Sequence, residues 1–451
     1  MVLADRQTPP LSKPTPPPSL PEFREFLLSG GFRARVARVA RLPEVAIRLV
    51  IDGGSASEAS AQAGVAALTA RVLQAGAGGH SAMELAEWLD QMGASVGSGV
   101  GYDSARFSLH SLSDSLDDAL DYLSTVLLSP DFPEEEVARI RAERMDEVRR
   151  SADEPTELAG EALSEAIFGA HPYGRSVRGQ LDTLESLHPA EVEGFWRARY
   201  RPGEAFLVAA GDIDPEGFTD RLENRFGGWS PREESGSAEA FQGRAVAAGD
   251  VVLVDRPGSE QSEIRIGAVG LARGDEDEVP VLVMNAILGG LFNSRLNMNL
   301  REDKGWTYGA GSGFSLRRAP GPFVARAAVD TPVTARAFEE MLAEIASMTE
   351  RPPSEEEMEL ARNALVLSLP RQFETTSQVA AKEAERVGYD LPADWWETLP
   401  RKVREVETED VIRVAAKYLG RNDLTLVVVG DGARIRADLE ALGQVRERPA
   451  P

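Results

Sequence analysis

The sequence predicts an α+β protein built from two copies of one unit. Its 451 residues exceed what one hydrophobic core usually supports, and two domains of about 200 residues are expected. Strand-like apolar runs and amphipathic helical patterns occur in both halves. The same closing pattern of helix, aromatic residue, turn, apolar strand and Gly-Asp occurs at 195–212 and again at 414–431. Such a repeat is typical of two homologous halves.

The composition excludes several classes of partner and of chemistry. Acidic side chains outnumber basic ones, 73 to 49, for a net charge of −24, so nucleic acid and anionic membranes are expected to be repelled. A neutral or basic peptide, or a less acidic subunit, would be tolerated. The chain has no cysteine, which removes disulfides, thiolate metal ligands and a cysteine nucleophile.

The sequence predicts a soluble protein without a signal peptide. It lacks an apolar run of about 18 residues, the minimum for a membrane-spanning helix. The N-terminal segment has no hydrophobic signal core. Both the cytoplasm and the periplasm remain open as compartments.

The first half is expected to follow a proline-rich N-terminal tail at 1–31 and to occupy 32–230. Two strands follow from the alternation of apolar residues between Phe32 and Ile51. Further strands are expected at 105–112 and 205–210. Helical patterns occupy 58–75, 81–92, 116–128, 134–150, 156–168, 189–200 and 215–226.

One predicted strand of this half, near 93–101, has almost no side chains on one of its two faces. Gly93, Ser95, Gly97, Gly99 and Gly101 occupy every second position. Glycine weakens a strand, so such a face implies close approach of another backbone. A neighbouring strand, a facing subunit and a bound extended peptide all meet this requirement.

The second half is expected at 250–440, after a polar linker at 231–249 and before a C-terminal tail at 441–451. Strands are predicted at 251–254, 264–271, 323–329 and 424–429. Helices are predicted at 278–288, 334–348, 354–369, 377–387 and 408–419.

The stretch 287–314 carries the most chemistry in the chain. An apolar helical run breaks at Gly289 and Gly290, resumes to Leu300, and passes after Gly305 into strand-like alternation. Arg301 and Tyr308 lie 308 − 301 = 7 positions apart across this helix-to-strand turn. A guanidinium and a phenol aimed at one point can polarise a peptide carbonyl and stabilise an oxyanion.

This stretch resembles a known signature. Its pattern G-G-x-x-x-S-R-L, followed by L-R-E-x-x-G-x-x-Y, is similar to the C-terminal-half motif of pitrilysin/insulysin-type zinc peptidases, nearest to the processing-peptidase-like members. The resemblance implies that each half is a mostly antiparallel sheet with helices packed mainly on one face, together forming half of a clamshell. It also implies that Arg301 and Tyr308 bind substrate, and we expect the glycines Gly97, Gly99, Gly101, Gly289 and Gly290 to contact it.

The zinc motif of that family is degenerate in this chain. The family pattern G-x-A-H-x-x-E-H aligns with residues 64–71, where Ala67, Ala70 and Arg71 replace the histidine, glutamate and histidine. Glu147, 147 − 71 = 76 positions beyond Arg71, matches the place of the third ligand. Alanine has no lone pair and arginine is a fixed cation. We therefore expect an Arg71–Glu147 ion pair and no catalytic metal or other cofactor in this chain.

No other catalytic pattern is evident. His80, His110, His171 and His188 never show the i, i+3 or i+4 spacing of metal ligands, so structural or surface roles are expected. No phosphate-binding loop, G-x-S-x-G elbow or dinucleotide fingerprint is present.

The favoured function is that of a non-catalytic, substrate-binding subunit of a heterodimeric zinc endopeptidase. A homologous partner would carry zinc, and Arg301 and Tyr308 would reach the scissile carbonyl of a peptide in trans. The alternative is an inert structural or assembly protein with the same clamshell, in which both side chains are packed. An independent peptidase with an unrecognised site is the third reading. The short Gly289–Gly290 pair departs from the long glycine-rich loop of the mitochondrial processing peptidase alpha subunit, so identity with that subunit is not expected.

Overall fold

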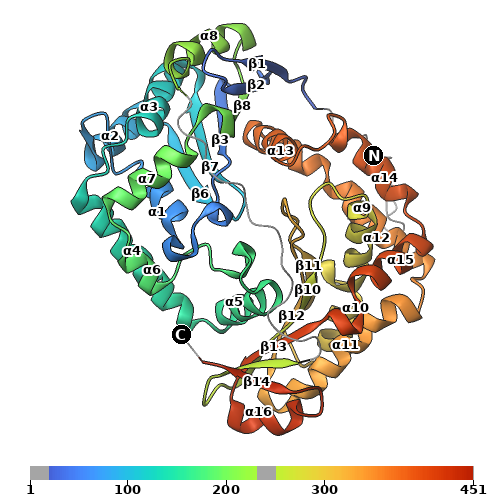
Figure 1. Ribbon diagram of the computed structural model, residues 1–451. Helices are drawn as coiled ribbons and strands as arrows, with labels where there is room; N and C mark the ends of the chain where they lie inside the picture. The colour runs from blue at the N-terminus through green and yellow to red at the C-terminus, as the bar shows by residue number, and fades with distance from the viewer. Residues whose placement is uncertain (1–19, 231–249, 450–451) are drawn as a thin grey trace, which may run out of the picture.

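A computed structural model describes residues 20–230 and 250–449 as two packed halves, each built on a six-stranded sheet (Figure 1). The N-terminal sheet has the order β1-β2-β8-β3-β7-β6 and the C-terminal sheet the order β11-β12-β10-β13-β9-β14. The strands of the first sheet are β1 Arg24–Leu27, β2 Arg33–Arg38, β3 Glu44–Ile51, β6 Ser95–Val100, β7 Ala105–Leu112 and β8 Ala205–Gly211. Those of the second are β9 Val251–Asp255, β10 Gln261–Val269, β11 Ala310–Phe314, β12 Pro322–Asp330, β13 Thr425–Gly430 and β14 Val445–Arg448. A short hairpin, β4 Gly76–Ala77 and β5 His80–Ser81, lies apart from them.

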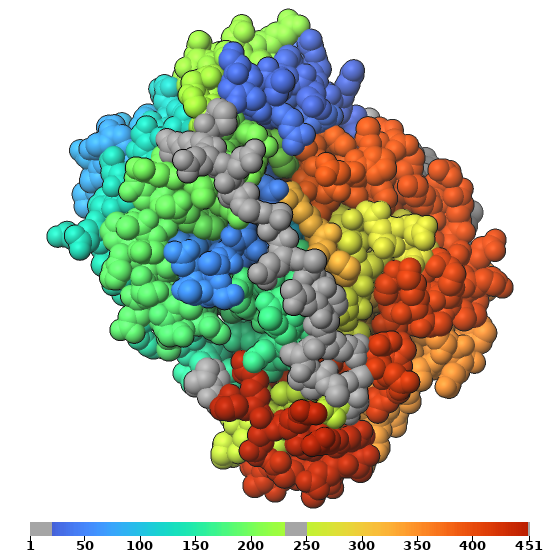
Figure 2. Space-filling model, viewed as in Figure 1, coloured from blue at the N-terminus to red at the C-terminus, as the bar shows by residue number. Residues whose placement is uncertain are grey.

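The two sheets share one topology, which confirms the predicted repeat. From the edge inwards, β6-β7-β3-β8-β2 corresponds to β11-β12-β10-β13-β9, and β1 and β14 each extend the far edge. Neighbouring strands are mostly antiparallel; the parallel pairs are β2–β8, β9–β13 and β9–β14. In the space-filling view the two halves pack side by side (Figure 2).

Most helices of each half cover the outer face of its own sheet, and α5 and α13 are the exceptions (Figure 1). The helices of the first half are α1 Val65–Val72, α2 Ala82–Met92, α3 Leu116–Leu128, α4 Glu134–Asp153, α5 Pro155–Phe168, α6 Leu181–Glu185, α7 Pro189–Arg199 and α8 Pro215–Phe226. In the second half they are α9 Glu278–Asn285, α10 Arg295–Asn297, α11 Thr334–Glu350, α12 Glu355–Ser368, α13 Thr376–Gly388, α14 Trp395–Glu405, α15 Thr408–Tyr418 and α16 Gly432–Leu439.

Two helices cross between the halves, an arrangement the sequence did not predict. Helix α5 of the first half packs on β10 and β13 of the second, and helix α13 of the second packs on β3 and β8 of the first. At the first contact, Gly267 gives room to Leu163 and Ile167, whose side chains would lie within 3.0 Å of a Cβ there. The inner face of each sheet is therefore covered by a helix from the opposite half.

Several helices, strands and tails have other boundaries in the structure than the sequence predicted. The predicted tails 1–31 and 441–451 contain β1 and β14, so both segments contribute strands to the sheets. The predicted helix 58–75 begins only at Val65, because Gly64 has φ +98° and Ser60–Gln62 forms a separate 3₁₀ turn. The predicted linker 231–249 and the first nineteen residues lie outside the described residues.

One helical stretch, Glu278–Asp303, has the length and apolar composition of a membrane-spanning segment. Its most apolar window is 61% buried inside the protein. Leu288, Leu296 and Leu300 all belong to the hydrophobic core of the second half, so this stretch is a core element.

Candidate functional site

Two adjoining cavities lie between the halves, and together they are called the chamber below. The first, of about 840 Å³, is bordered by β3, β6, β7 and α13 and by residues 314–318. The second, of about 620 Å³, is bordered by α1, α4, α5, the loop 174–178 and strands β10 and β12. Ser98 and Gly99 of β6 border both cavities, so this strand runs along their common wall.

The glycine strand predicted from the sequence is β6, the edge strand of its sheet. No strand of the described residues pairs with its outer edge. Gly97 and Gly99 border the first cavity, and Gly101 borders a smaller one of about 390 Å³. A Cβ at Gly99 would meet no atom within 4 Å, so packing within this chain does not require glycine there. Contact of these glycines with a substrate remains a prediction.

Helix α1 presents the degenerate metal site to the second cavity. Ala67, Ala70 and Arg71 border that cavity. The predicted ion pair is confirmed: Arg71 Nη1 lies 2.7 Å from Glu147 Oε1. Arg144 Nη1 lies 2.8 Å from the other carboxylate oxygen of Glu147. Burial alone would raise the pKa of Glu147, but hydrogen bonds and charges from Arg71 and Arg144 lower it below its ordinary value.

These residues do not fit a zinc ion. Zinc sites use neutral histidines, carboxylates or thiolates, whereas this position offers two alanines and two guanidinium groups around one carboxylate. Within the described residues, no three His, Cys, Asp or Glu side chains cluster in a way that could hold a metal ion.

A buried carboxylate that sequence reasoning missed caps helix α1. Glu58 is 7% exposed and accepts hydrogen bonds from the backbone N–H groups of Gly64 (3.0 Å) and Ala66 (2.8 Å). Burial raises the pKa of Glu58 to about 7, and these bonds and the nearby arginines Arg175 and Arg144 oppose the shift. Glu58 thus satisfies two of the free N–H groups at the start of the helix that carries the degenerate site.

Arg301 is half-buried, and Tyr308 is exposed on the surface of the second half. Arg301 lies in a π-helical segment, Met298–Asp303, with its guanidinium carbon 4.5 Å from the ring centre of Phe292. Tyr308 is 94% exposed and lies in the turn before β11, which starts only at Ala310 and not at Trp306 as the alternation suggested. Neither side chain borders the chamber. Their substrate contacts remain a prediction.

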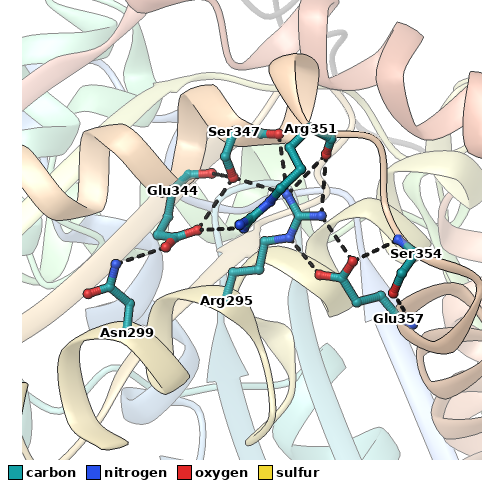
Figure 3. A network of polar contacts seen from close by, with 7 residues as sticks. All are labelled: Arg295, Asn299, Glu344, Ser347, Arg351, Ser354 and Glu357. Atoms are coloured by element: carbon teal, nitrogen blue, oxygen red, sulfur yellow. Dashed lines mark hydrogen bonds and ion pairs between the residues drawn. The ribbon is translucent and has the colours of Figure 1, made fainter. Parts of the chain in front are cut away.

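The arginine of the S-R-L motif has a structural role that the sequence did not reveal. Arg295 is buried and joins the short helix α10 to the end of α11 and the start of α12 (Figure 3). Its Nε and Nη2 donate to the carboxylate of Glu357 at 2.6 and 3.1 Å. Its Nη1 donates to Ser347 Oγ at 3.0 Å and to the Arg351 carbonyl at 3.3 Å.

The paired glycines Gly289 and Gly290 end a second π-helical segment, Ala286–Gly290. A Cβ at Gly289 would come within 2.3 Å of the Ser312 backbone nitrogen, so glycine is needed for β11 to pack there. Asn285 fixes the same contact, because its Oδ1 accepts from Ser312 Oγ at 2.8 Å. In this chain Gly289 therefore has a packing role, and Gly290 is exposed beside it.

A cluster of polar and aromatic side chains joins the two halves beside the smaller cavity of about 390 Å³. Arg317 of the second half stacks on Tyr102 and Tyr173 of the first, with its guanidinium carbon 3.8 and 4.6 Å from the ring centres. Tyr173 Oη donates to Asp103 Oδ1 at 2.5 Å and accepts from the Ala319 N–H at 3.2 Å. Burial and the bond to Asp103 raise the pKa of Tyr173.

The histidines have local partners, in keeping with structural roles. His110 Nε2 lies 3.0 Å from Glu44, His171 Nδ1 accepts from the Tyr173 N–H, and His188 Nδ1 accepts from Arg141. The His80 ring lies 5.5 Å from that of Trp88.

Comparison with known proteins matches both halves to one group of peptidases. Residues 36–180 match the family model described as insulinase (peptidase family M16), and residues 186–365 match the peptidase M16 inactive domain. An uncharacterised zinc protease of Rickettsia felis is 25% identical over 416 residues, covering 89% of this chain and 98% of that protein. An uncharacterised zinc protease of Bacillus subtilis is 23% identical, covering 90% of this chain and 98% of the relative.

Solved structures share the fold. A peptidase M16 inactive domain from Pseudomonas fluorescens superposes with a TM-score of 0.84 at 25% identity, covering 90% of this chain and 98% of that chain. A protease from Helicobacter pylori superposes with a TM-score of 0.85 at 17% identity, covering 91% of this chain and 100% of that chain.

Proposed function

Because the chain belongs to the M16 peptidase family yet carries alanine and arginine where that family binds zinc, we propose that it is a substrate-binding subunit of a two-chain zinc endopeptidase. The observation that carries this proposal is the open edge of β6 along the chamber wall.

An extended peptide is the ligand that such an edge accepts. The outer backbone N–H and C=O groups of β6 are free to pair with an added strand, and main-chain hydrogen bonds of this kind give affinity without demanding a sequence. Glycine at position 99 leaves the space beside the strand empty. The chamber, with cavities of about 840 and 620 Å³, has room for side chains of the bound peptide.

The chemistry would come from a homologous partner that carries the metal. Arg301 and Tyr308 would then stabilise the oxyanion formed at the scissile carbonyl. The exposure of Tyr308 supports action on a substrate held partly by another chain. Phe292 and Met298, 59% and 39% exposed, lie on the same segment and offer apolar surface for that partner.

A reconstitution assay tests the proposal. The chain is assayed for metal-dependent cleavage of unstructured peptides alone, and then mixed with an M16 homologue that has an intact H-x-x-E-H motif. Cleavage that requires both chains supports the subunit function. No cleavage in any mixture favours the alternative, an inert structural protein, and cleavage by the chain alone would contradict both.

A variant in β6 links the assay to the proposed site. Gly99→Leu fills the empty space beside β6 and should abolish peptide binding while leaving the thermal unfolding temperature unchanged. Gly194→Leu is the matched control, because a Cβ at that exposed position on α7 also meets no atom within 4 Å. Equal peptide binding by both variants would refute the assignment of β6.

A further inference from the structure

The chamber is basic although the chain as a whole is acidic. The wall of the first cavity carries five basic side chains (Arg48, Arg106, Arg273, Arg318 and Lys382) and two acidic ones (Asp103 and Glu385). The wall of the second carries six arginines (Arg71, Arg144, Arg175, Arg178, Arg265 and Arg326) and two glutamates (Glu157 and Glu161). This excess of positive charge lies inside a protein of net charge −24.

Most of these basic groups are already neutralised by a carboxylate. Some of those carboxylates lie behind the cavity walls, and the others belong to the walls themselves. The pairs are Arg71 with Glu143 and Glu147, Arg144 with Glu147, Arg178 with Glu157 and Glu161, Arg265 with Glu263, Arg273 with Glu278 and Glu385, Arg318 with Asp52, and Lys382 with Glu385. These side chains add little net attraction for a ligand.

Four arginines of the cavity walls have no carboxylate partner in the part of the chain that the structure describes: Arg48, Arg106, Arg175 and Arg326. Arg48 donates to the Ile47 carbonyl and to Ser377 of α13, and the other three are called the unpaired chamber arginines below. Among the described residues, none of the three has a carboxylate oxygen within 4.0 Å. Arg106 donates to Ser104 Oγ at 3.2 Å, and Arg175 donates to Ser60 Oγ and to the Glu58 carbonyl. The Nε atoms of Arg175 and Arg144 are buried without a hydrogen-bond partner. These Nε atoms are out of reach of a ligand, but a carboxylate in the chamber would pair with the exposed side chains of Arg106 and Arg326.

The unpaired chamber arginines border the path of a peptide on β6. Arg106 lies on β7 directly opposite Gly99, so the bare glycine leaves the arginine side chain uncovered. Arg326 lies on β12 opposite Gly311 of the other edge strand, and it borders the second cavity together with Gly99 and Arg175. Side chains of an added strand that enter the cavities would meet guanidinium groups from both halves.

We propose that the peptides bound along β6 are acidic, with aspartate or glutamate side chains placed against Arg106, Arg175 and Arg326. This inference rests on the proposed function and names its substrate class. The negative outer surface does not prevent it, because charges more than about 8 Å away are largely screened at physiological ionic strength. Inside the chamber screening is weaker, and the local arginines decide the sign of the preference.

Calorimetric titration of the full chain with three matched peptides tests the proposal. The peptides share one extended framework and carry glutamate, glutamine or lysine at alternate positions. The glutamate peptide should bind about ten-fold or more tightly than the glutamine peptide, since hydrogen bonds to charged groups contribute more than neutral ones. The difference should shrink as salt rises.

Single substitutions assign the preference to the named residues. Arg106→Gln and Arg326→Gln, at exposed side chains, should each weaken the glutamate peptide about ten-fold and leave the glutamine peptide unchanged. Arg401→Gln is the control, because Arg401 is exposed on α14 and pairs with Glu405 away from the chamber. Loss of affinity in the control variant as well would overturn the assignment.

The outcomes separate this inference from the function on which it rests. Equal affinity for all three peptides, or tightest binding of the lysine peptide, overturns the acidic preference and leaves peptide binding standing. Binding of inorganic phosphate without discrimination among the peptides also overturns it, because the arginines then bind only a small anion. Failure of every peptide to bind overturns both.

Discussion

Arg48 and Arg265 occupy equivalent places in the two sheets and make the same contact with the opposite half. Arg48 on β3 donates from Nη2 to the carbonyl of Ser377 near the start of α13, at 3.5 Å. Arg265 on β10 donates from Nη2 to the carbonyl of Thr156 near the start of α5, at 3.4 Å. Each arginine therefore fixes the helix that crosses onto its sheet.

Substitution of either arginine should weaken the contact between the halves. The loss in the free energy of unfolding should be larger for Arg265 than for Arg48. Arg265 is 4% exposed, and Arg265→Met would leave Glu263 without its ion-pair partner, at a cost of about 3 kcal/mol or more in the free energy of unfolding. Arg48→Met would cost about 1 to 3 kcal/mol, the contribution of hydrogen bonds from a charged group. Urea unfolding measures both, with Arg401→Met as control. An Arg265→Met midpoint equal to the control would contradict this account.

The degenerate site should become a zinc site when its ligands are restored. Arg71 already reaches Glu147, so position 71 lies within ligand range of the third carboxylate. The combined changes Ala67→His, Ala70→Glu and Arg71→His should retain about one zinc ion per chain after gel filtration, measured by elemental analysis. Adding Glu147→Gln should reduce that retention. A restored motif that holds no zinc would show that the geometry around α1 has changed as well.

Stability should fall with rising pH through the titration of Glu58. Its pKa is raised from 4.5 in the unfolded chain to about 7 in the folded one, so the folded state binds the proton more tightly. Protonation of Glu58 therefore contributes to the free energy of unfolding. This contribution is fully present below pH 4.5 and is lost as the pH rises to about 7, at up to about 1.4 kcal/mol per pH unit. The advantage of the wild type over Glu58→Gln should therefore narrow from pH 5 to pH 7 in unfolding titrations. A constant difference would mean that burial does not shift this pKa.

Arg301 and Tyr308 should matter for turnover and not for folding. In the reconstituted pair, Arg301→Ala or Tyr308→Phe should slow cleavage by about two to three powers of ten, the usual effect of losing one oxyanion donor. Because Tyr308 is 94% exposed, Tyr308→Phe should change the free energy of unfolding by less than about 0.5 kcal/mol. Unchanged cleavage rates in both variants would remove these residues from the mechanism.

Arg295→Ala should be severely destabilising, in contrast to the neighbouring Arg301→Ala. The substitution removes the bonds to Glu357, Ser347 and Arg351 and leaves the partly buried Glu357 carboxylate without its cation. The expected loss is about 3 to 5 kcal/mol in the free energy of unfolding. Thermal unfolding of the two alanine variants side by side checks the difference, and similar values would mean that the Arg295 network contributes little.

The sequence predicted the structural features that depend on local residue patterns and on the internal repeat. The two Gly-Asp closures predicted two sheets of one topology, and the alignment of α1 with a metal-binding motif placed Arg71 and Glu147 together across 76 positions. Apolar and glycine periodicity likewise located β6 and most helices, because these patterns depend on neighbouring residues alone.

Features that depend on distant segments could not be predicted. Periodicity shows that α5 and α13 have apolar faces, but not that each meets the sheet of the other half. The sequence does not show whether an arginine is buried, as Arg295 is, or exposed, as Arg326 is. The basic chamber arises because arginines from several strands and loops converge while many of their carboxylate partners lie behind the wall.

The exchange of α5 and α13 constrains how this architecture could have arisen. A half-length ancestor carrying one copy of the repeat would have left the inner face of its sheet bare, with its own crossing helix directed away from it. Such a chain could bury the inner face of its sheet and the apolar face of its crossing helix only by exchanging helices with a second identical copy. Gene fusion would then have turned an obligate symmetric pair into one polypeptide, after which the two copies were free to diverge.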